Sequence, residues 1–473
     1  MPQSGRNPEP TAHTVPAGIF RAYDIRGLAN TELSANVVEQ IGRAIGTEAL
    51  AQDISSLLCG QDARLSSPVL GAALIRGIRS SGCNVVDLGM VHTPLLYFAT
   101  YTTGFDSGVM LTASHNPADY NGIKIVLRRS CLADNQIQNL RQRIERQEYS
   151  SGQGGYQKLN LRQQYLARIC QDIQLTGKPR IVLDCGNAVT ATIAPELFAS
   201  LGCEVIPLFC ELDGRFPNHE PDPTQPDNLR DLSKTVLANH ADLGIAFDGD
   251  GDRLGIVTDA GEIIDTDRLL LLLIEDILPR HPGEKVIYDV KCSTRLPDTI
   301  KALGGRPVMH RSGHSFMKQK MQETGAVLGG EFAAHVFIRD RWFGFDDGLY
   351  AAARVVEILT RSGLPASRLF SRFGHPPATP ELKVPVAEER KFELMQRIIA
   401  GADFPDGKII LLDGIRVEFN DGWGLVRASN TSPALLLRFE ANSPEALRRI
   451  QLRFRELLLQ ADKSLPICFP EQL

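Results

Sequence analysis

The sequence predicts an α/β fold, because apolar strands alternate with helical stretches along most of its 473 residues. Three segments within this alternation resemble one another. A fourth segment, from Glu381 onward, has a different order: a strand, a helix, two or three strands and a final helix. We therefore expect three related α/β domains followed by a smaller C-terminal α+β domain.

Each of the three similar segments begins with an apolar strand that ends in aspartate, at Asp62, Asp184 and Asp289. A helical stretch follows and stops at a glycine, which is common just past a helix end because the backbone there often needs a positive φ. These glycines are Gly82, Gly202 and Gly304. A unit present three times explains this order simply, although βαβ segments also resemble one another by default.

Each unit then runs a short apolar strand into an unusual polar loop. The three loops read TASHNP (112–117), DGDGDR (248–253) and GEFAAH (330–335). Ligands of open α/β sheets bind outside the carboxyl ends of the strands. The three loops are therefore expected to occupy equivalent, ligand-facing positions.

Composition shifts mark the expected boundaries. SGQGGYQ (151–157) is a glycine-rich break, FGHPPATP (373–380) is proline-rich, and a further boundary is expected near residues 260–262. We predict a disordered lead-in at 1–18, domain 1 at 19–157, domain 2 at 158–261, domain 3 at 262–374 and domain 4 at 375–473.

Bulk properties exclude several classes of protein. A net charge of −5 gives no drive toward nucleic acid or anionic membrane. The longest strongly apolar run, Leu269 to Ile274, is far too short to span a bilayer, and the N-terminus has no apolar signal core. Nine cysteines without a CxxC pair argue against a disulfide framework or a structural zinc site. We expect a cytoplasmic protein without nucleic-acid or membrane partners.

The loop DGDGDR places Asp248, Asp250 and Asp252 at the end of an apolar strand. Like charges this close repel unless a cation lies among them, and hard carboxylate oxygens suit Mg²⁺ or Ca²⁺. A solvated acidic turn is the plain alternative. An EF-hand is disfavoured, because its sixth and twelfth positions would be Arg253 and Asp259 instead of Gly and Glu.

The loop TASHNP places Ser114 among small residues at a strand end, with His115 beside it and Lys124 ten residues further on. This arrangement suits an exposed nucleophile with a cation that neutralises phosphate. An ordinary turn is an equally plain interpretation. A serine hydrolase is disfavoured, because no G-x-S-x-G elbow surrounds the serine.

The loop RASNTSP (427–433) gathers an arginine and several neutral hydrogen-bonding groups between two strands, a set that suits a phosphate dianion or a polar hairpin turn. The chain has no Walker motif and no GxGxxG, so nucleotide binding of those types lacks support. Glu331 and His335 of the third loop, Tyr23 and Arg26 of FRAYDIRG (20–27), and Lys291 and His314 on other loops of the third unit are further candidates. Each of these alone could be structural.

Taken together and in order, FRAYDIRG, TASHNPADYNGIK, DGDGDR, GEFAAH and RASNTSP resemble the α-D-phosphohexomutase family, particularly its bacterial phosphomannomutase/phosphoglucomutase branch. The resemblance covers roughly residues 19–462. It implies four domains, three of them related and arranged around a central cleft. It also implies a Mg²⁺-dependent intramolecular phosphotransferase that acts on phosphohexoses, with hexose 1,6-bisphosphate as intermediate and activator.

The resemblance also implies residue roles. Ser114 would carry the phosphoryl group and complete a Mg²⁺ site with Asp248, Asp250 and Asp252. His115, Lys124, Arg253 and His335 would act in catalysis, with either Lys124 or His335 as the base. The implied substrate-binding residues are Tyr23, Arg26, Lys291, His314, Glu331, Arg427, Ser429, Asn430 and Thr431.

One position departs from the family pattern. The sugar loop usually reads Glu-x-Ser, whereas this chain has Ala333 after Glu331 and Phe332. The missing hydroxyl leaves open whether mannose, glucose or both are preferred. Phosphoglucosamine mutase is a rival reading, but that branch typically has a GTDGIRG-like start and an SGTEP-like phosphate loop. A degenerate sugar-phosphate- or metal-binding homologue is the other alternative, and we expect a monomer or weak dimer.

Overall fold

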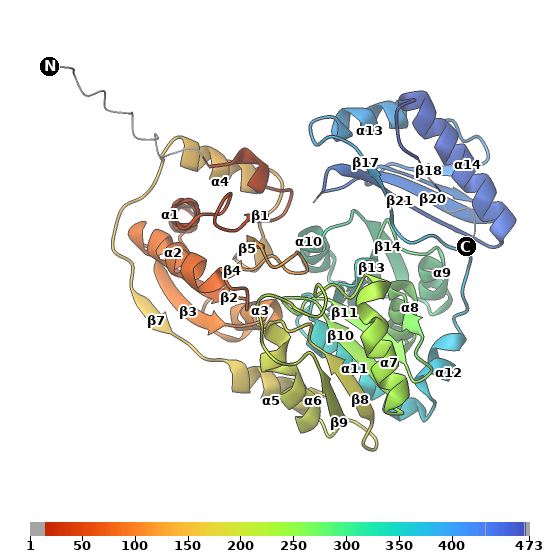
Figure 1. The fold of residues 1–473 in the computed structure, drawn as a ribbon, viewed down its shortest axis with the longest axis horizontal. Helices are drawn as coiled ribbons and strands as arrows, with labels where there is room; N and C mark the ends of the chain where they lie inside the picture. Colours follow the sequence, from red (N-terminus) through yellow and green to blue (C-terminus); the bar gives the residue numbers. More distant parts are fainter. Residues whose placement is uncertain (1–14, 431, 468, 470–473) are drawn as a thin grey trace.

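The computed structural model describes residues 15–430, 432–467 and 469. Its strands form four separate sheets, which lie in four successive parts of the chain (Figure 1). Most of the expected lead-in, residues 1–14, lies outside the described part. None of the described helices is both long and apolar enough to cross a membrane.

The first unit has a seven-stranded sheet in the order β1-β5-β4-β2-β3-β7, with β6 beside β5. Its strands are β1 (Ile25–Leu28), β2 (Ser56–Gln61), β3 (Asn84–Met90), β4 (Gly108–Leu111), β5 (Tyr120–Leu127), β6 (Ser130–Cys131) and β7 (Tyr156–Lys158). Its helices are η1 (Ala17–Ile19), α1 (Ala35–Ala51), α2 (Ser67–Ser80), α3 (Thr93–Thr102) and α4 (Asn135–Glu145). Helices α1 and α2 pack closely because Gly77 has no side chain: a Cβ there would lie 2.0 Å from the Glu39 carbonyl oxygen.

The second unit has the sheet β12-β11-β10-β8-β9. Its strands are β8 (Arg180–Asp184), β9 (Glu204–Leu208), β10 (Leu243–Phe247), β11 (Leu254–Thr258) and β12 (Ile263–Ile264). Its helices are α5 (Arg162–Asp172), η2 (Val189–Thr192), α6 (Ala194–Ser200), η3 (Pro226–Leu229) and α7 (Arg230–Ala238).

The third unit has the sheet β14-β13-β15-β16. Its strands are β13 (Lys285–Asp289), β14 (Arg306–His310), β15 (Leu328–Gly330) and β16 (Val336–Ile338). Its helices are α8 (Thr266–Ile277), η4 (Leu278–Arg280), α9 (Arg295–Ala302), α10 (His314–Thr324), α11 (Gly348–Ser362) and α12 (Ala366–Ser371).

The three units share one strand arrangement, so the expected repeat is confirmed. In each unit a central strand (β2, β8 or β13) has a parallel neighbour on either side. One of these neighbours (β4, β10 or β15) also pairs with an antiparallel strand. The resulting orders are β5-β4-β2-β3, β11-β10-β8-β9 and β16-β15-β13-β14. Gly82, Gly202 and Gly304 all have positive φ, at 98°, 95° and 76°. The three polar loops therefore follow the equivalent strands β4, β10 and β15.

The C-terminal unit is a five-stranded antiparallel sheet in the order β17-β21-β20-β19-β18. Its elements are β17 (Leu382–Pro385), α13 (Lys391–Ala400), β18 (Lys408–Ile410), β19 (Ile415–Phe419), β20 (Gly422–Ala428), β21 (Ala434–Ala441) and α14 (Pro444–Ala461). Four strands thus lie between the two helices, where the sequence predicted two or three. The additional strand, β18, is short and largely exposed, so it has little of the buried apolar pattern that identifies a strand.

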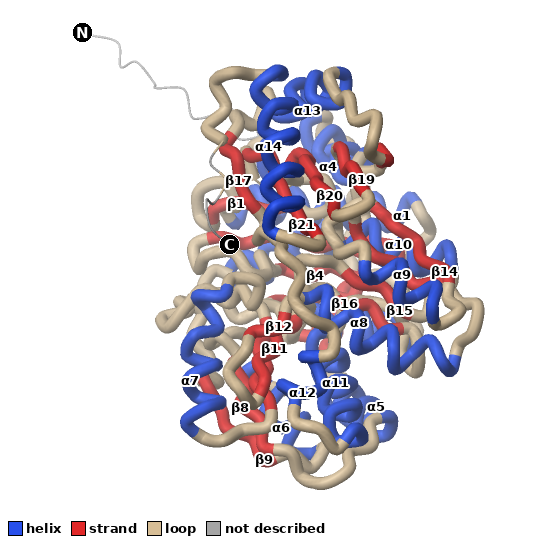
Figure 2. Tube along the Cα trace, turned by 90° about the vertical axis from the view of Figure 1, so that its right-hand side faces the viewer, coloured by secondary structure: helices blue, strands red, loops and turns tan. Residues whose placement is uncertain are grey.

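Hydrophobic packing joins the first three units in one large core, while a small cluster of Val290, Trp423 and Leu425 joins the fourth unit to the third. The largest core extends from Phe98 of α3 through Tyr165 of α5 to Trp342 and Tyr350 of the third unit, whose rings stack at 4.2 Å. The C-terminal unit has a core of its own. In Figures 1 and 2 it lies at the top of the molecule, at the opposite end from strands β8 and β9. The cleft thus lies between three units that share one large core and a fourth unit that has its own core.

Candidate active site and family

A cleft of about 1170 Å³ opens where the four units meet. It is lined by the following residues singled out from the sequence: Tyr23, Arg26, Ser114, His115, Lys124, Arg253, Lys291, His314, Glu331, His335, Arg427, Ser429 and Asn430. Thr431 lies outside the described residues. The aspartates of the second loop do not line the cleft but are fully buried beneath it.

Ser114 lies on the loop after β4 and is only 2% exposed, so it is less open than the sequence suggested. Its φ of 50° is in the left-handed region, where non-glycine residues are uncommon. Its Oγ donates a hydrogen bond to Oδ2 of Asp248 at 2.5 Å and lies 3.3 Å from Nδ1 of His115. The strained backbone thus directs the hydroxyl toward the aspartate loop of the second unit.

Arg64 holds the Ser114 loop in this conformation and was not anticipated from the sequence. Its guanidinium is 1% exposed and donates to the carbonyl oxygens of Ser114 at 2.8 Å and Asn116 at 2.6 Å, and to those of Pro117 and Tyr120. Its Nε donates to Asp62, which ends the β2 region. The only sequence signal was the position of this arginine two residues after a strand-ending aspartate.

The aspartate loop combines three buried carboxylates with one lysine. Nζ of Lys124 donates to Oδ2 of Asp250 at 2.6 Å and to Oδ2 of Asp252 at 2.5 Å. Gly251, with a φ of 78°, allows the tight turn between them. Burial and the charges of its two neighbours raise the pKa of Asp248. Burial also opposes ionisation of Asp252, but Lys124 and His335 outweigh it and lower the pKa of that carboxyl.

The same three carboxylates fit a divalent cation. One oxygen of each lies within 4.8 Å of the others. Oδ1 of Asp250 and Oδ1 of Asp252 are buried and accept no hydrogen bond from any described residue. Oxygen donors free of other partners are the ligands that hard cations prefer. The second loop can therefore hold a metal ion directly beneath the Ser114 hydroxyl.

Thr93, at the start of α3, supports this loop from the first unit. Its backbone N–H donates to the Asp250 carbonyl oxygen at 2.9 Å, and its hydroxyl donates to Oδ2 of the same residue. The metal loop is thus fixed by a neighbouring domain, through a contact between residues 157 positions apart in the sequence.

His335, at the end of the third loop, lies against Arg253 at the end of the aspartate loop. Its Nε2 is 3.1 Å from Nε of Arg253, and its Nδ1 is 3.1 Å from Oδ2 of Asp346. Because arginine can only donate, Nε2 must carry the lone pair and Nδ1 the proton. Lys318 donates to the other oxygen of Asp346 at 2.7 Å and to the Tyr97 hydroxyl at 3.0 Å. This buried network orients the histidine ring.

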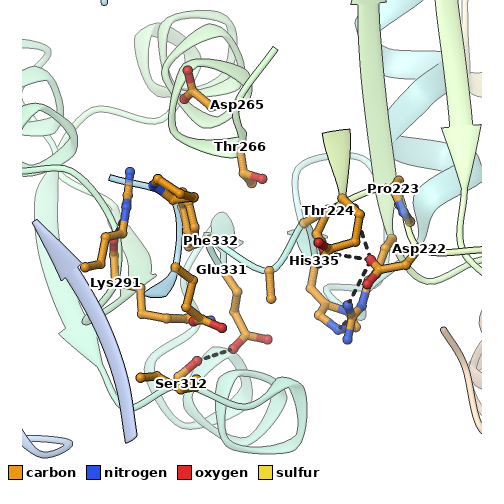
Figure 3. Close-up of a pocket in the computed structure, with 18 of the residues that line it drawn as sticks. Asp222, Pro223, Thr224, Asp265, Thr266, Lys291, Ser312, Glu331, Phe332 and His335 are labelled. Carbon is orange, nitrogen blue, oxygen red and sulfur yellow. Dashed lines mark hydrogen bonds and ion pairs between the residues drawn. The ribbon is translucent and has the colours of Figure 1, made fainter. Parts of the chain in front are cut away.

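The third loop presents a carboxylate to the cleft. Oε1 of Glu331 accepts a hydrogen bond from the Gly313 N–H at 2.6 Å, and Ser312 lies beside it (Figure 3). Burial raises the pKa of Glu331. Ala333 is half-buried and lines the same wall, where it offers no hydrogen-bonding group. His314 lies at the first position of α10, whereas the sequence placed it on a loop.

Cationic side chains gather on the C-terminal side of the cleft. Nε of Arg427 donates to Oδ2 of Asp413 at 2.9 Å, and its Nη2 is buried without a partner among the described residues. The same Asp413 oxygen accepts from the Ser312 N–H at 3.0 Å, which links the fourth domain to the third. Lys291 lies 3.2 Å from Glu381. These cations line the same cleft as the third loop and suit an anionic group.

Comparisons with known proteins agree with this geometry. Models of phosphoglucomutase/phosphomannomutase domains I, II, III and the C-terminal domain match residues 17–151, 163–261, 265–374 and 381–457. A phosphomannomutase/phosphoglucomutase of Pseudomonas aeruginosa is 51% identical over 458 residues, covering 97% of this chain and 99% of that protein. A phosphoglucomutase of Neisseria gonorrhoeae is 45% identical, covering 93% and 96%.

A solved structure of a phosphoglucomutase/phosphomannomutase family protein from Burkholderia thailandensis superposes with a TM-score of 0.91 at 45% identity. It covers 96% of this chain and 100% of that one. The family expected from the motifs is therefore confirmed, and so is its four-domain α/β architecture. This chain belongs to the phosphoglucomutase/phosphomannomutase family of α-D-phosphohexomutases.

Proposed function

We propose that this chain is a phosphohexomutase that interconverts hexose 1-phosphates and hexose 6-phosphates of mannose, glucose or both, through a phosphoserine at Ser114. The observation that carries the proposal is the presence of two features in one cleft. The Ser114 hydroxyl lies 2.5 Å from a buried carboxylate cluster that fits a cation, and the C-terminal domain contributes Nη2 of Arg427, which has no partner among the described residues.

In the proposed reaction the serine-bound phosphoryl group passes to the free hydroxyl of a hexose phosphate. The O–P bond to Ser114 breaks, a bond to the sugar oxygen forms, and the hydroxyl proton passes to a base. The product is a hexose 1,6-bisphosphate. After the bisphosphate turns over in the cleft, the reverse transfer returns its other phosphate to Ser114. The same bisphosphate therefore phosphorylates the free enzyme and acts as its activator.

Asp248, Asp250 and Asp252, with a phosphoserine oxygen, would hold Mg²⁺. Bound there, the ion would neutralise charge on the transferring phosphoryl group, which is the main requirement of this chemistry. Lys124 and Arg253 lie beside these aspartates, at Asp250 and Asp248 respectively, and would add positive charge. His115 beside the serine has a pKa well below its usual range, because of burial and the neighbouring Arg253 and Arg26, and would bind phosphate as a neutral donor.

Lys124 and His335 are the two candidate bases, and the geometry favours the histidine. Lys124 donates to two carboxylates and is held as a cation by them. His335 carries its lone pair on Nε2, which faces Arg253 at the cleft. Release of Arg253 toward phosphate would free that lone pair for a sugar hydroxyl.

Substrate contacts follow from the walls of the cleft. Glu331 would accept hydrogen bonds from sugar hydroxyls, and the residues that would hold the non-reacting phosphate are Arg427, Ser429, Asn430 and Thr431. Tyr23, Arg26, Lys291 and His314 would complete the site. Because the two orientations of the bisphosphate are nearly symmetric, one phosphate site on the fourth domain can serve both.

Several further features remain our proposals. The domains are expected at 19–157, 158–261, 262–374 and 375–473. We expect the protein to act in the cytoplasm, without nucleic acid or membrane, as a monomer or weak dimer. Sedimentation of the purified chain would test the last of these.

Coupled assays of the purified protein test the proposed function. Mannose 1-phosphate, glucose 1-phosphate and glucosamine 1-phosphate are supplied separately, each with Mg²⁺ and a hexose 1,6-bisphosphate. We expect turnover of the first, the second or both. Turnover of the glucosamine compound alone would instead favour a phosphoglucosamine mutase, and no turnover of any would favour a degenerate homologue.

A further inference from the structure

Two thiols lie side by side in the second unit, outside the cleft. Cys185 directly follows β8 and Cys210 follows β9, two strands that pair in parallel. Their sulfur atoms are 3.4 Å apart. A disulfide bond is about 2.05 Å long, so an approach of about 1.4 Å would join them. No other described pair of cysteine sulfurs lies within hydrogen-bonding distance of each other.

The two thiols differ in exposure and acidity. Cys185 is fully buried, whereas Cys210 is partly exposed. The hydrogen bond that the two thiols share lowers the pKa of Cys210, against the opposing effect of burial. The same contact and burial raise the pKa of Cys185. The exposed and more acidic thiol is the one that an oxidant reaches first, and the buried one lies in position to resolve it.

The segment that contains Cys210 is held at its start by hydrogen bonds to Asn187. Asn187, two residues after Cys185, donates its backbone N–H to the Phe209 carbonyl oxygen at 2.8 Å and its side-chain amide to that of Glu211 at 2.8 Å. The Asp213 N–H donates back to the Asn187 carbonyl oxygen at 2.9 Å. Displacement of Cys210 toward Cys185 would therefore be transmitted along the backbone beyond residue 210.

The segment comprises residues 209–222, and its far end, at Pro221 and Asp222, contacts the metal loop and Arg253. The Pro221 carbonyl oxygen accepts a hydrogen bond from Gly249 of the metal loop at 3.2 Å, and Asp222 lies 3.8 Å from Arg253. Between these ends, the Phe216 ring lies 5.1 Å from the guanidinium of Arg64, which holds the Ser114 loop. One segment therefore connects the thiol pair with the metal loop and the serine loop.

We infer that Cys185 and Cys210 form a reversible disulfide when the protein meets a peroxide, and that this disulfide lowers turnover by shifting residues 209–222. The Cys210 thiolate attacks a peroxide oxygen: an S–O bond forms, the O–O bond breaks, and hydroxide leaves as water after protonation. The Cys185 sulfur then attacks the sulfenic sulfur, expelling a second water as the S–S bond forms. Two thiols lose two electrons, hydrogen peroxide gains them, and a dithiol reductant reverses the change.

The effect on turnover rests on the proposed mutase function, but the disulfide itself does not. The test treats the Mg²⁺-loaded, reduced protein with hydrogen peroxide and follows intact mass, non-reducing peptide maps and mutase rate. We expect a loss of about 2 Da, for two hydrogens, with a cross-linked peptide that joins residues 185 and 210. We also expect kcat to fall about tenfold, as a displaced catalytic loop would cause, and to recover with dithiothreitol.

Cys210→Ser tests the assignment with a nearly isosteric change at a partly exposed residue. It should form no cross-link and keep its kcat in peroxide. Cys170→Ser removes another partly exposed but solitary thiol and should respond as the wild type does. Over-oxidation of Cys210 without a cross-link, or an unchanged kcat in the cross-linked protein, would overturn the inference. If the reduced protein lacks mutase activity altogether, the proposed function fails, while the mass measurement still decides on the disulfide.

Discussion

The guanidinium of Arg64 donates a 2.8 Å hydrogen bond to the backbone carbonyl oxygen of Ser114, and the serine occupies the left-handed region at a φ of 50°. Further bonds from the same guanidinium reach Asn116, Pro117 and Tyr120. Buried hydrogen bonds from a charged donor are individually worth about 1.5–3 kcal/mol, comparable with the cost of one strained residue at about 1–3 kcal/mol. Arg64 thus offsets the strain that directs the nucleophile.

Arg64→Lys should lower kcat about tenfold to a hundredfold while KM changes little, since a lysine has three donors and cannot span four carbonyl groups. Steady-state kinetics measure the split. Arg354→Lys is the control, because Arg354 is equally buried but pairs with Asp276 and Asp340 and does not line the cleft. The control should lose thermal stability and keep kcat. The reverse result, an unchanged kcat in Arg64→Lys, would make Arg64 merely structural.

Removal of the metal should destabilise the protein as well as inactivate it. The three buried carboxylates repel one another, and a ligand present at about 100 times its Kd stabilises the folded state by about 2.7 kcal/mol. Addition of Mg²⁺ after chelation should raise Tm in the wild type, and Asp250→Asn should abolish the rise. Asp406→Asn alters an exposed carboxylate paired with Arg453 and should leave the rise intact. An Asp250→Asn protein that responds normally would place the metal elsewhere.

Ala333→Ser should alter sugar preference more than it alters catalysis. The substitution adds a hydroxyl beside Glu331, and one neutral hydrogen bond is worth about 0.5–1.5 kcal/mol, or up to about tenfold in binding. The ratio of kcat/KM for mannose 1-phosphate to that for glucose 1-phosphate should therefore change by up to about tenfold. Ala333→Gly adds no donor and should leave the ratio near that of the wild type. An equal ratio in all three proteins would show that position 333 does not contact the sugar.

Asp347 should make stability depend on pH. It caps α11 and accepts from the Tyr350 N–H and the Tyr165 hydroxyl, but burial outweighs these bonds and raises its pKa from 3.8 to about 7. The folded state then binds more protons than the unfolded state between about pH 4 and pH 7, so this contribution to stability is lost as pH rises through that window. Asp347→Asn does not titrate. The difference in Tm, wild type minus variant, should fall across the window, and a constant difference would contradict the shift.

Local patterns in the sequence predicted the repeated unit and the loops that carry the site. Two short-range signals were used: the strands that end in Asp62, Asp184 and Asp289, and the glycines that follow the helices. They defined the order of elements in each unit, and that order predicted the strands β4, β10 and β15 before the polar loops. The same patterns could not indicate buried polar contacts between domains. Thr93 reaches Asp250 across 157 positions and Lys318 reaches the Tyr97 hydroxyl of the first unit, so both contacts depend on how the units pack. The contacts of Arg64 with carbonyl oxygens lie within the first unit, but they join residues 50 to 56 positions apart, beyond the reach of a local pattern.

The exposure of the site residues was the other property that the sequence could not predict. Ser114 was expected on an open turn, yet it is 2% exposed because the aspartate loop of the second unit lies directly against it. Burial of this kind arises only after domains assemble. It also explains the chemistry, since charges in a site shielded from water interact more strongly than at the surface.

The most direct test of the account is the intact mass of the protein after incubation with a hexose 1,6-bisphosphate and Mg²⁺. The wild type should gain about 80 Da, the mass of one phosphoryl group, and peptide mapping should locate it at Ser114. Ser114→Ala should gain nothing and lose most of its mutase activity. An alanine variant that still acquires the added mass, or a wild type that turns over hexose phosphates without ever carrying it, would contradict a phosphoserine at this position.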